Sequence, residues 1–356
     1  MMLQGHFIDG LLDPAFRDKE NELISWWLYF RGITAPVFFT VSGFIVSYLL
    51  LSNTAQNHHN PRIKKSLKRG LELIFYGYLL RLNFGGLFKG QLYNTFYQVD
   101  VLHCLGLALL SIVVLYKVHL WLRNLGLKWA YSMIQLSIVL LLFLGEPYYK
   151  NFEYEYLPQL FSNYLNKANG SVFTIIPWLG YSSFGALLSQ VYLHFQNKPY
   201  FYPFFILSSL LSGLLLVHCS SDVFTELIAL HSTFAFLQEA VNNNYLFIRL
   251  GDVFIVFAVF SSLRVLTKYK SIVKIGQSTL TTYIIHYMIL YGSFTGYGLY
   301  RYYKESLNWS EASAFALLFI LTCTLSALVY HHFKPKLKTW ITCVKHDFLK
   351  RLKQLL

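Results

Sequence analysis

Long apolar runs occupy most of this chain, and they restrict its possible folds more than any other feature. A helix needs about 20 apolar residues to cross a hydrocarbon core of about 30 Å. About nine runs of this kind can be placed, with bounds 27–51, 70–88, 99–117, 127–144, 171–194, 201–218, 246–264, 276–300 and 312–333. They lack the alternation of a membrane β-barrel, so we expect an all-α, polytopic bundle of about nine transmembrane helices.

The composition supports a membrane protein and excludes several soluble classes. Hydrophobic residues make up 55% of the chain and charged residues 13%, which leaves too little polar surface for two soluble domains. The net charge of +13 would otherwise suggest a nucleic acid as partner. Because the basic residues lie in short blocks between apolar runs, we expect the lipid bilayer as partner and no nucleic acid. The four cysteines lack CxxC spacing, and we expect no metal site.

The basic residues also predict the orientation, because short loops rich in Lys and Arg stay in the cytoplasm. Twenty of the thirty fall in alternate connections, at 62–69, 117–128, 198, 264–274 and 334–353. Eight fall on the opposite side, and the other two lie inside apolar runs. We therefore expect a multi-pass protein of the cytoplasmic membrane whose N-terminus is outside and whose C-terminus is inside.

The beginning of the chain is unusual for this topology. An odd number of helices with an external N-terminus needs an earlier crossing, yet residues 1–25 contain five acids and form no signal peptide. We expect one more helix upstream, with residues 1–4 as its outer end, followed by a short polar segment. No period of about 20 to 50 residues recurs, so residues 1–356 are predicted to form a single integral-membrane domain.

Ionisable side chains near the apolar runs are candidates for a functional site, because burial in a membrane costs several kcal/mol unless the group is paired or hydrated. Arg31 lies about one turn inside the first run, and Arg81 lies about 10 Å below the external end of the second. Asp100 and His103 open the third run on one helical face. His6 precedes the first run and can reach the same level. We expect these five residues to meet near the outer face, with Arg81 paired to Asp100.

Each of these residues also has a purely structural interpretation. Arg31 could extend to the outer headgroups, and Arg81 and Asp100 could form a structural ion pair. Asp100 could instead cap its helix. His103 could be a packing residue and His6 a surface residue. Their expected position on one side of the membrane favours a shared site.

Two other runs contain polar groups that could bind a ligand. Pro177 interrupts the outer half of the fifth run, and the indole N–H of Trp178 could serve a ligand or the carbonyl that the proline frees. His286 lies about ten residues into the eighth run, near the bilayer midplane. Its structural alternative is a hydrogen bond between helices.

Short motifs occur in a fixed order along most of the chain. They are residues 5–9 (GHFID), 29–44 (YFRGITAPVFFTVSGF), 68–82 (KRGLELIFYGYLLRL), 99–106 (VDVLHCLG), 177–180 (PWLG) and 275–286 (IGQSTLTTYIIH). Together they resemble the transmembrane acyltransferases related to heparan-α-glucosaminide N-acetyltransferase, including bacterial members. They resemble other integral-membrane acyltransferases more distantly.

The resemblance implies a bundle of about ten or eleven helices that takes an acetyl group from cytosolic acetyl-CoA to an acceptor at the outer face. The acceptor would be a saccharide or glycan with an amine or a hydroxyl. A membrane-embedded histidine near that face is the family's catalytic group. His6 is the best positional match, because it closes the Gly-His motif that ends the family's first helix.

Acyl transfer gives each candidate a role. A neutral imidazole with a pKa near 6.5 can remove the acceptor proton, so we assign His6 as general base and His103 as its substitute. Asp100 would orient an imidazole or a charged acceptor amine. Arg31 and Arg81 would stabilise the oxyanion.

The remaining candidates are assigned to substrate binding. Lys65 and Arg69, in the cytoplasmic basic block, would face the phosphates of CoA, although anionic lipid headgroups account for the same charges. Trp178 and His286 complete the predicted binding residues. The alternatives are a membrane transporter or a lipid- or saccharide-handling protein without transferase activity, and a non-catalytic remnant. A transporter should show paired broken helices in two halves, whereas only the break at Pro177 is visible.

Overall fold

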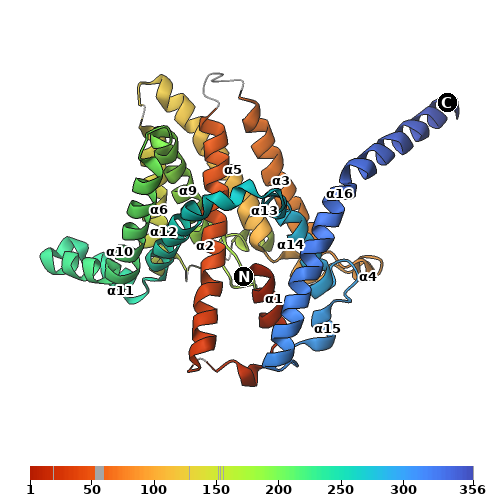
Figure 1. Cartoon of the computed structure of the whole chain (residues 1–356), viewed down its shortest axis with the longest axis horizontal. Helices are drawn as coiled ribbons and strands as arrows, with labels where there is room; N and C mark the ends of the chain where they lie inside the picture. Colours follow the sequence, from red (N-terminus) through yellow and green to blue (C-terminus); the bar gives the residue numbers. More distant parts are fainter. Residues whose placement is uncertain are drawn as a thin grey trace. The chain divides into compact units, whose positions relative to one another are not determined.

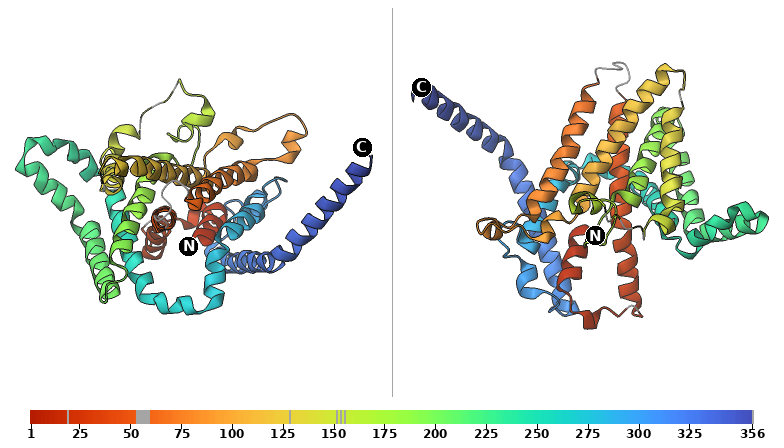
Figure 2. Two further views of the ribbon diagram at one scale, coloured as in Figure 1. Left: turned by 90° about the horizontal axis from the view of Figure 1, so that it is seen from above. Right: turned by 180° about the vertical axis from the view of Figure 1, so that it is seen from behind.

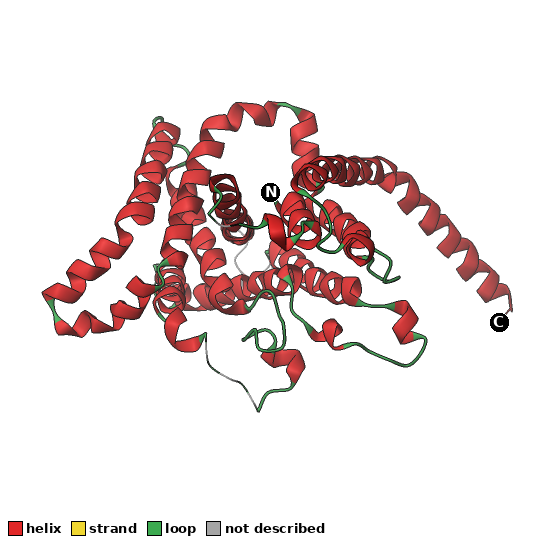
Figure 3. Ribbon diagram, turned by 90° about the horizontal axis from the view of Figure 1, so that it is seen from below, coloured by secondary structure: helices red, strands yellow, loops and turns green. Residues whose placement is uncertain are grey.

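The computed structural model describes residues 1–18, 20–52, 60–127, 129–150, 152, 154 and 156–355. In this part of the chain the secondary structure is helical, with two isolated β-bridges and no strand (Figure 3). The prediction of an all-α fold is confirmed. Lys128, one of the basic residues predicted to be cytoplasmic, lies outside the described residues.

Five helical segments of the described chain are long and apolar enough to cross a membrane. They are α2 (Glu22–Leu51), η3 (Asn94–Tyr97) with α5 (Val101–Asn124), α10 (Phe201–Leu230), α12 (Tyr245–Ser262) with η5 (Leu263–Lys268), and residues Trp309–Lys336 of α16 (Trp309–Leu355). Each coincides with one of the predicted apolar runs. The chain is therefore a multi-pass integral membrane protein.

The other four predicted runs form shorter or more polar helices. They are α3 (Pro61–Arg81), α6 (Ala130–Leu144), α9 (Ile175–Phe195) and α14 (Thr279–Tyr291). Run 276–300 was predicted as one helix, but α14 ends at Tyr291 because Gly292 has a φ of 68° and caps the helix in the left-handed conformation. A loop and the short α15 (Leu299–Tyr303) follow. In run 70–88 the helix α3 also ends earlier than predicted, at Arg81.

Pro177 follows a break near the start of α9, as the sequence predicted. Ile176 has φ −103° and ψ 121°, and the Ile176–Pro177 peptide bond is cis. The regular part of α9 begins at the proline, because a residue before proline favours extended backbone and proline suits the first helical position. The predicted break in the fifth run is therefore present at Ile176, and the regular helix follows it.

The described chain divides into two compact units. Unit 1 contains Met1–Ser25, Asn83–Gly85 and Val265–Leu356, and unit 2 contains Trp26–Leu82 and Gly86–Arg264. A single domain over the whole chain stays a prediction.

Glycines let the helices of unit 2 pack with their backbones close together. α3 runs along α5 and α10 runs along α12 (Figures 1 and 2). A Cβ on Gly106 of α5 would lie 2.6 Å from the carbonyl oxygen of Gly70 on α3. A Cβ on Gly213 of α10 would lie 2.8 Å from the carbonyl oxygen of Gly251 on α12. Contacts between small residues are a common basis of helix association in membranes.

α2 and α9 also touch through glycine. A Cβ on Gly43 would overlap the backbone of Ser182, and a Cβ on Gly185 would overlap the backbone of Thr40. The Ser182 hydroxyl donates to the Phe39 carbonyl oxygen at 3.3 Å. This close contact fixes α9, which carries Trp178, against α2, which carries Arg31.

Unit 1 contains a packed N-terminal helix. α1 (Met2–Leu11) packs on α16 and contacts α14 and α15. The ring of Phe7 lies 5.1 Å from that of Phe319, and Ile8 and Leu11 are buried. Arg17 donates to the carbonyl oxygen of Leu12 at 2.5 Å, which ties down the chain after the helix. The prediction of a short polar segment here was wrong, because Phe7, Ile8 and Leu11 bury one face of α1.

Candidate functional site

Arg81 and Asp100 meet in unit 2, where the outer ends of α3 and α5 were predicted to bring them together. Arg81 is the last residue of α3, and Asp100 caps the N-terminus of α5. Arg81 Nη2 lies 3.6 Å from Asp100 Oδ2, and about one tenth of each side chain is exposed. Arg81 Nη1 also donates to the Thr95 carbonyl oxygen at 3.1 Å and to Gln98 Oε1 at 3.0 Å. The predicted contact is confirmed.

Asp100 and His103 form a reciprocal cap at the start of α5. Asp100 Oδ1 accepts the Val101 N–H at 2.6 Å, and the carboxylate also accepts the N–H of His103. In return, His103 Nδ1 accepts the backbone N–H of Asp100 at 3.1 Å. Asp100 therefore both caps the helix and pairs with Arg81. A neutral His103 must carry its proton on Nε2, because its Nδ1 lone pair is already used.

Tyrosines enclose the His103 ring. The ring is fully buried, and its centroid lies 4.2 Å from that of Tyr78 and 6.3 Å from that of Tyr164. Tyr78 donates a hydrogen bond to the Tyr164 hydroxyl at 3.2 Å. Burial raises the pKa of Tyr164, so this hydroxyl stays protonated. Within the described chain, His103 Nε2 has no hydrogen-bond partner. In this arrangement His103 is an enclosed donor and offers no free lone pair.

The segment before α9 folds over this end of α3 and α5. Asn163 donates to the Tyr97 carbonyl oxygen at 2.7 Å and accepts from Asn169 at 3.0 Å. The Ser171 hydroxyl accepts the Val99 N–H at 3.0 Å. Sequence reasoning missed this segment, although three asparagines within residues 163–174 indicate a loop held by side-chain hydrogen bonds.

His6 and His286 lie side by side in unit 1. Their ring centroids are 5.3 Å apart, with an angle of 29° between the planes. The Tyr291 hydroxyl lies 3.4 Å from His6 Nδ1, and the edge of Tyr283 meets His286 at 4.7 Å. His286 is fully buried, whereas His6 is half-buried. Sequence reasoning treated the two histidines separately, because nothing in the sequence connects positions on α1 and α14.

Arg31 and Trp178 have aromatic neighbours in unit 2. The guanidinium of Arg31 lies 5.5 Å from the centroid of the Trp27 ring, one turn earlier on α2. The Trp178 ring lies 5.2 Å from Phe39 and 4.9 Å from Phe173. Trp178 thus belongs to an aromatic cluster at the start of α9. Its role in ligand binding stays a prediction.

A buried ion pair on α12 is hydrogen-bonded to Tyr29 of α2, and sequence reasoning missed it. Arg249 Nη1 lies 2.9 Å from Asp252 Oδ2, and Asp252 is 3% exposed. The Tyr29 hydroxyl donates to Asp252 Oδ1 at 2.5 Å, and Arg249 donates to the Tyr29 carbonyl oxygen at 3.1 Å. Arg249 is one of the eight basic residues that were counted on the external side, and it lies on α12. The available signal was an Arg and an Asp three residues apart inside the predicted run 246–264.

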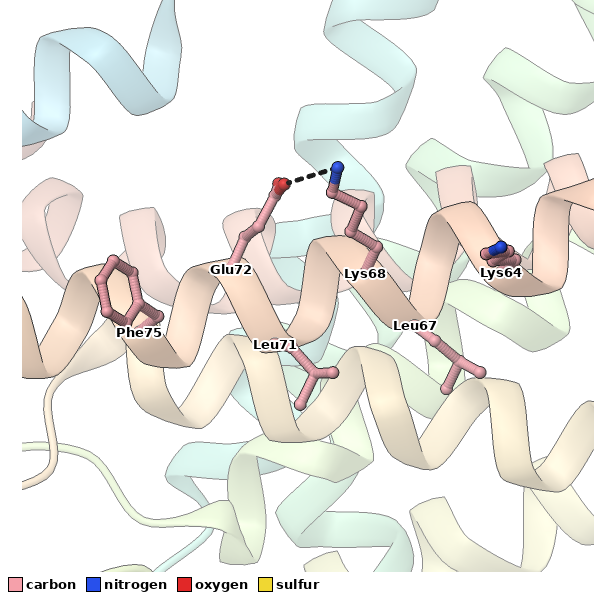
Figure 4. A pocket seen from close by; sticks show the side chains of 6 residues that line it. All are labelled: Lys64, Leu67, Lys68, Leu71, Glu72 and Phe75. Carbon is pink, nitrogen blue, oxygen red and sulfur yellow. Dashed lines mark ion pairs between the residues drawn. The ribbon is translucent and has the colours of Figure 1, made fainter. Parts of the chain in front are cut away.

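Lys65 and Arg69 are exposed on α3. Arg69 Nη1 lies 4.0 Å from one carboxylate oxygen of Glu72, and Lys68 Nζ lies 3.8 Å from the other. A hollow of about 530 Å³ runs along the helix, and Figure 4 shows its lining. The lining residues are Lys64, Leu67, Lys68, Leu71, Glu72 and Phe75. The hollow is open, all of its lining residues belong to α3, and its accessible surface is almost wholly apolar.

Comparison with known proteins identifies the family. The sequence model of a family described as an acyltransferase domain matches residues 1–331. The chain belongs to this acyltransferase family. No curated protein matches the chain, and no solved structure matches it. Membership of the acyltransferase-3 family confirms the predicted class of membrane-bound acyltransferase. The specific relationship to heparan-α-glucosaminide N-acetyltransferase stays a prediction.

The described residues contain no group of three or more His, Cys, Asp or Glu that could hold a metal ion. The candidate groups for acyl transfer are side chains that accept or donate protons or carry charge. In unit 1 they are His6 and His286, and in unit 2 they are Arg81, Asp100 and His103.

Proposed function

We propose that this member of the acyltransferase-3 family moves an acetyl group from cytosolic acetyl-CoA to an acceptor at the outer membrane face. The acceptor would be an amine or hydroxyl of a saccharide. The observation that carries the proposal is the family match over residues 1–331 of a multi-pass membrane protein.

His6 is the proposed general base. It removes the proton from the acceptor, whose nitrogen or oxygen then forms a bond to the acetyl carbonyl carbon as the carbon–sulfur bond of the thioester breaks. The proton passes to the CoA thiolate, so the transfer is balanced. His6 is half-buried and has a hydroxyl neighbour at Nδ1. His103 is the weaker candidate, because its Nδ1 already accepts the Asp100 N–H.

The charges near His103 are proposed to support the reaction electrostatically. Arg81 is held by Thr95, Gln98 and Asp100, so its guanidinium has a fixed direction. A fixed positive group stabilises the negative charge that develops on the acetyl oxygen without reorganising. Asp100 is then a positioning residue for Arg81, and Arg31 is the second proposed source of positive charge.

The α3 basic block is the proposed binding site for the CoA phosphates. Lys65 and Arg69 are exposed on α3, and an open, mainly apolar hollow runs along the same helix. Phosphates favour such cations, and the apolar hollow suits the rest of an acyl-CoA arm. This assignment also requires the proposed orientation, with α3 beginning in the cytoplasm and the N-terminus of the chain outside.

Transfer in sealed vesicles tests the proposal. Purified protein is reconstituted with labelled acetyl-CoA on the side reached by a probe at Lys65 and with a mixture of amino sugars and glycans on the other side. We expect label in the saccharide fraction, at a rate that falls when Lys65 and Arg69 are both changed to Gln. Saccharide movement without acetylation would favour a transporter and contradict the proposal.

A further inference from the structure

The stacked pair of His6 and His286 assigns a function to a buried residue of unit 1. We infer that His286 is a positioning residue that holds the His6 imidazole in the plane required for proton transfer. This inference rests on the proposed function, in which His6 is the base.

The burial of the two rings separates their roles. His286 is fully buried, so it cannot reach an acceptor directly. His6 is half-buried, and its ring lies 5.3 Å from His286 at an interplanar angle of 29°. The more accessible His6 ring therefore stacks on the buried His286 ring, as expected for a base and a residue that positions it.

A row of tyrosines on α14 fixes the position of His286. Tyr283, Tyr287 and Tyr291 are spaced four residues apart, so they form a row along one side of α14, next to His286. The centroid of His286 is 4.7 Å from that of Tyr283 and 5.6 Å from that of Tyr287. Tyr287 in turn lies 4.7 Å from Tyr291, whose hydroxyl lies 3.4 Å from His6 Nδ1. Tyr283 and Tyr287 therefore contact His286, and Tyr291 contacts His6.

α1 itself is held in place from two further helices. Phe7, adjacent to His6, packs on Phe319 of α16. Tyr300 of α15 packs against Tyr291 at 5.7 Å and lies close to Gly10, where an added Cβ would meet its ring at 3.0 Å. The packing of α1 positions the backbone of His6, and stacking on His286 then acts on the orientation of its ring.

The orientation of a base has a large effect on rate. A proton acceptor must lie within hydrogen-bond distance of the proton with its lone pair aligned, and a misplacement of about 1 Å can reduce the rate about 10²-fold. The Tyr291 hydroxyl lies 3.4 Å from His6 Nδ1, and the His286 ring lies beside the face of the same imidazole. The flat ring of His286 therefore restricts rotation of the His6 ring.

Kinetics of ring-retaining and ring-removing variants test the inference. We expect His286→Ala to lower kcat about 10- to 100-fold while KM for acetyl-CoA stays within about twofold of the wild-type value. His286→Phe keeps a flat ring and should restore kcat to within a few-fold of wild type. His286→Leu fills the space without a flat ring and should behave like Ala, which keeps the test informative if the alanine variant folds poorly. His218→Ala, at an exposed histidine of α10, is the matched control.

A second readout does not depend on acetyl transfer. Diethyl pyrocarbonate modifies neutral imidazoles, and mass spectrometry of the N-terminal peptide reports its reaction with His6. The reaction uses the nitrogen lone pair in the plane of the ring, so its rate depends on how that plane is held. Modification of His6 should therefore differ several-fold from wild type in His286→Ala and His286→Leu, and stay close to wild type in His286→Phe.

The two readouts separate the possible failures. Wild-type protein that transfers no acetyl group would reject the proposed function, and the modification rates would still decide whether His286 holds His6. Unchanged reactivity of His6 in His286→Leu would overturn the inference. Wild-type kcat in His286→Leu, or kcat as low in His286→Phe as in His286→Ala, would also overturn it.

Discussion

The ion pair between Arg249 and Asp252 provides a sharp test of the fold, because both charges belong to a segment apolar enough to cross a membrane. Asp252 is 3% exposed, and the side chain of Arg249 is 20% exposed. Asp252 Oδ2 lies 2.9 Å from Arg249, and its other oxygen accepts the Tyr29 hydroxyl at 2.5 Å. Asp252→Ala removes both of these contacts and leaves the Arg249 guanidinium without its carboxylate partner.

The expected magnitude follows from this geometry. Removing one member of a buried ion pair costs about 3–5 kcal/mol, mainly because the remaining charge stays desolvated. Replacing both members by apolar residues is often close to neutral. We therefore expect Asp252→Ala to lower the free energy of unfolding by about 3–5 kcal/mol, and the double variant Asp252→Leu with Arg249→Met to recover most of that loss. Asp222→Ala, at an exposed acid on α10, should change it by less than about 0.5 kcal/mol.

Reversible unfolding by sodium dodecyl sulfate in mixed micelles measures these free energies. If Asp252→Ala lowers the free energy of unfolding by less than about 1 kcal/mol, the reasoning is refuted, because an unpaired, desolvated guanidinium should destabilise the protein by more than that. A double variant as unstable as the single one would refute it as well. That result would mean that packing at this position, and not the unpaired charge, causes the loss.

Two further predictions each compare the stability of a variant with that of a control variant of the same chain. Gly43→Ala should destabilise the protein by about 1–3 kcal/mol, because the added methyl overlaps the backbone of Ser182, whereas Gly276→Ala meets nothing within 4 Å and should have little effect in the same unfolding assay. Asp100→Ala should be about 1 kcal/mol less stable than Asp100→Asn, because the amide oxygen can still cap α5 while both variants lose the ion pair with Arg81. Equal stability of the two Asp100 variants would contradict the cap.

Hydropathy predicts which segments form helices better than it predicts where they end. The apolar runs at 27–51 and 312–333 were predicted from composition, because lipid-facing backbone must satisfy its own hydrogen bonds. Their interruptions depend on single residues whose backbone conformation is set by tertiary contacts. Gly292 ends α14 in a run that remains apolar, and Pro177 starts α9 inside a run that begins earlier.

Contacts between consecutive helices were easier to predict than contacts between distant ones. Arg81 and Asp100 were paired correctly because α3 and α5 were predicted as consecutive antiparallel helices, with both residues toward the same side of the membrane. His6 and His286 lie about 280 residues apart, and their contact depends on how α1 packs against α14. No spacing rule reports such packing, so the partner of the proposed base could be found only in the structure.

The catalytic role of His6 is the central claim, and the initial rate of labelled acetyl transfer tests it most directly. Wild-type protein and His6→Ala are compared in vesicles of the same composition and protein content, with correct folding checked by size-exclusion chromatography. Loss of a positioned proton acceptor should reduce the rate about 10²- to 10⁴-fold. A rate within a few-fold of wild type in His6→Ala would contradict the account. A deep loss confined to His103→Ala would contradict it too, and would move the base to α5.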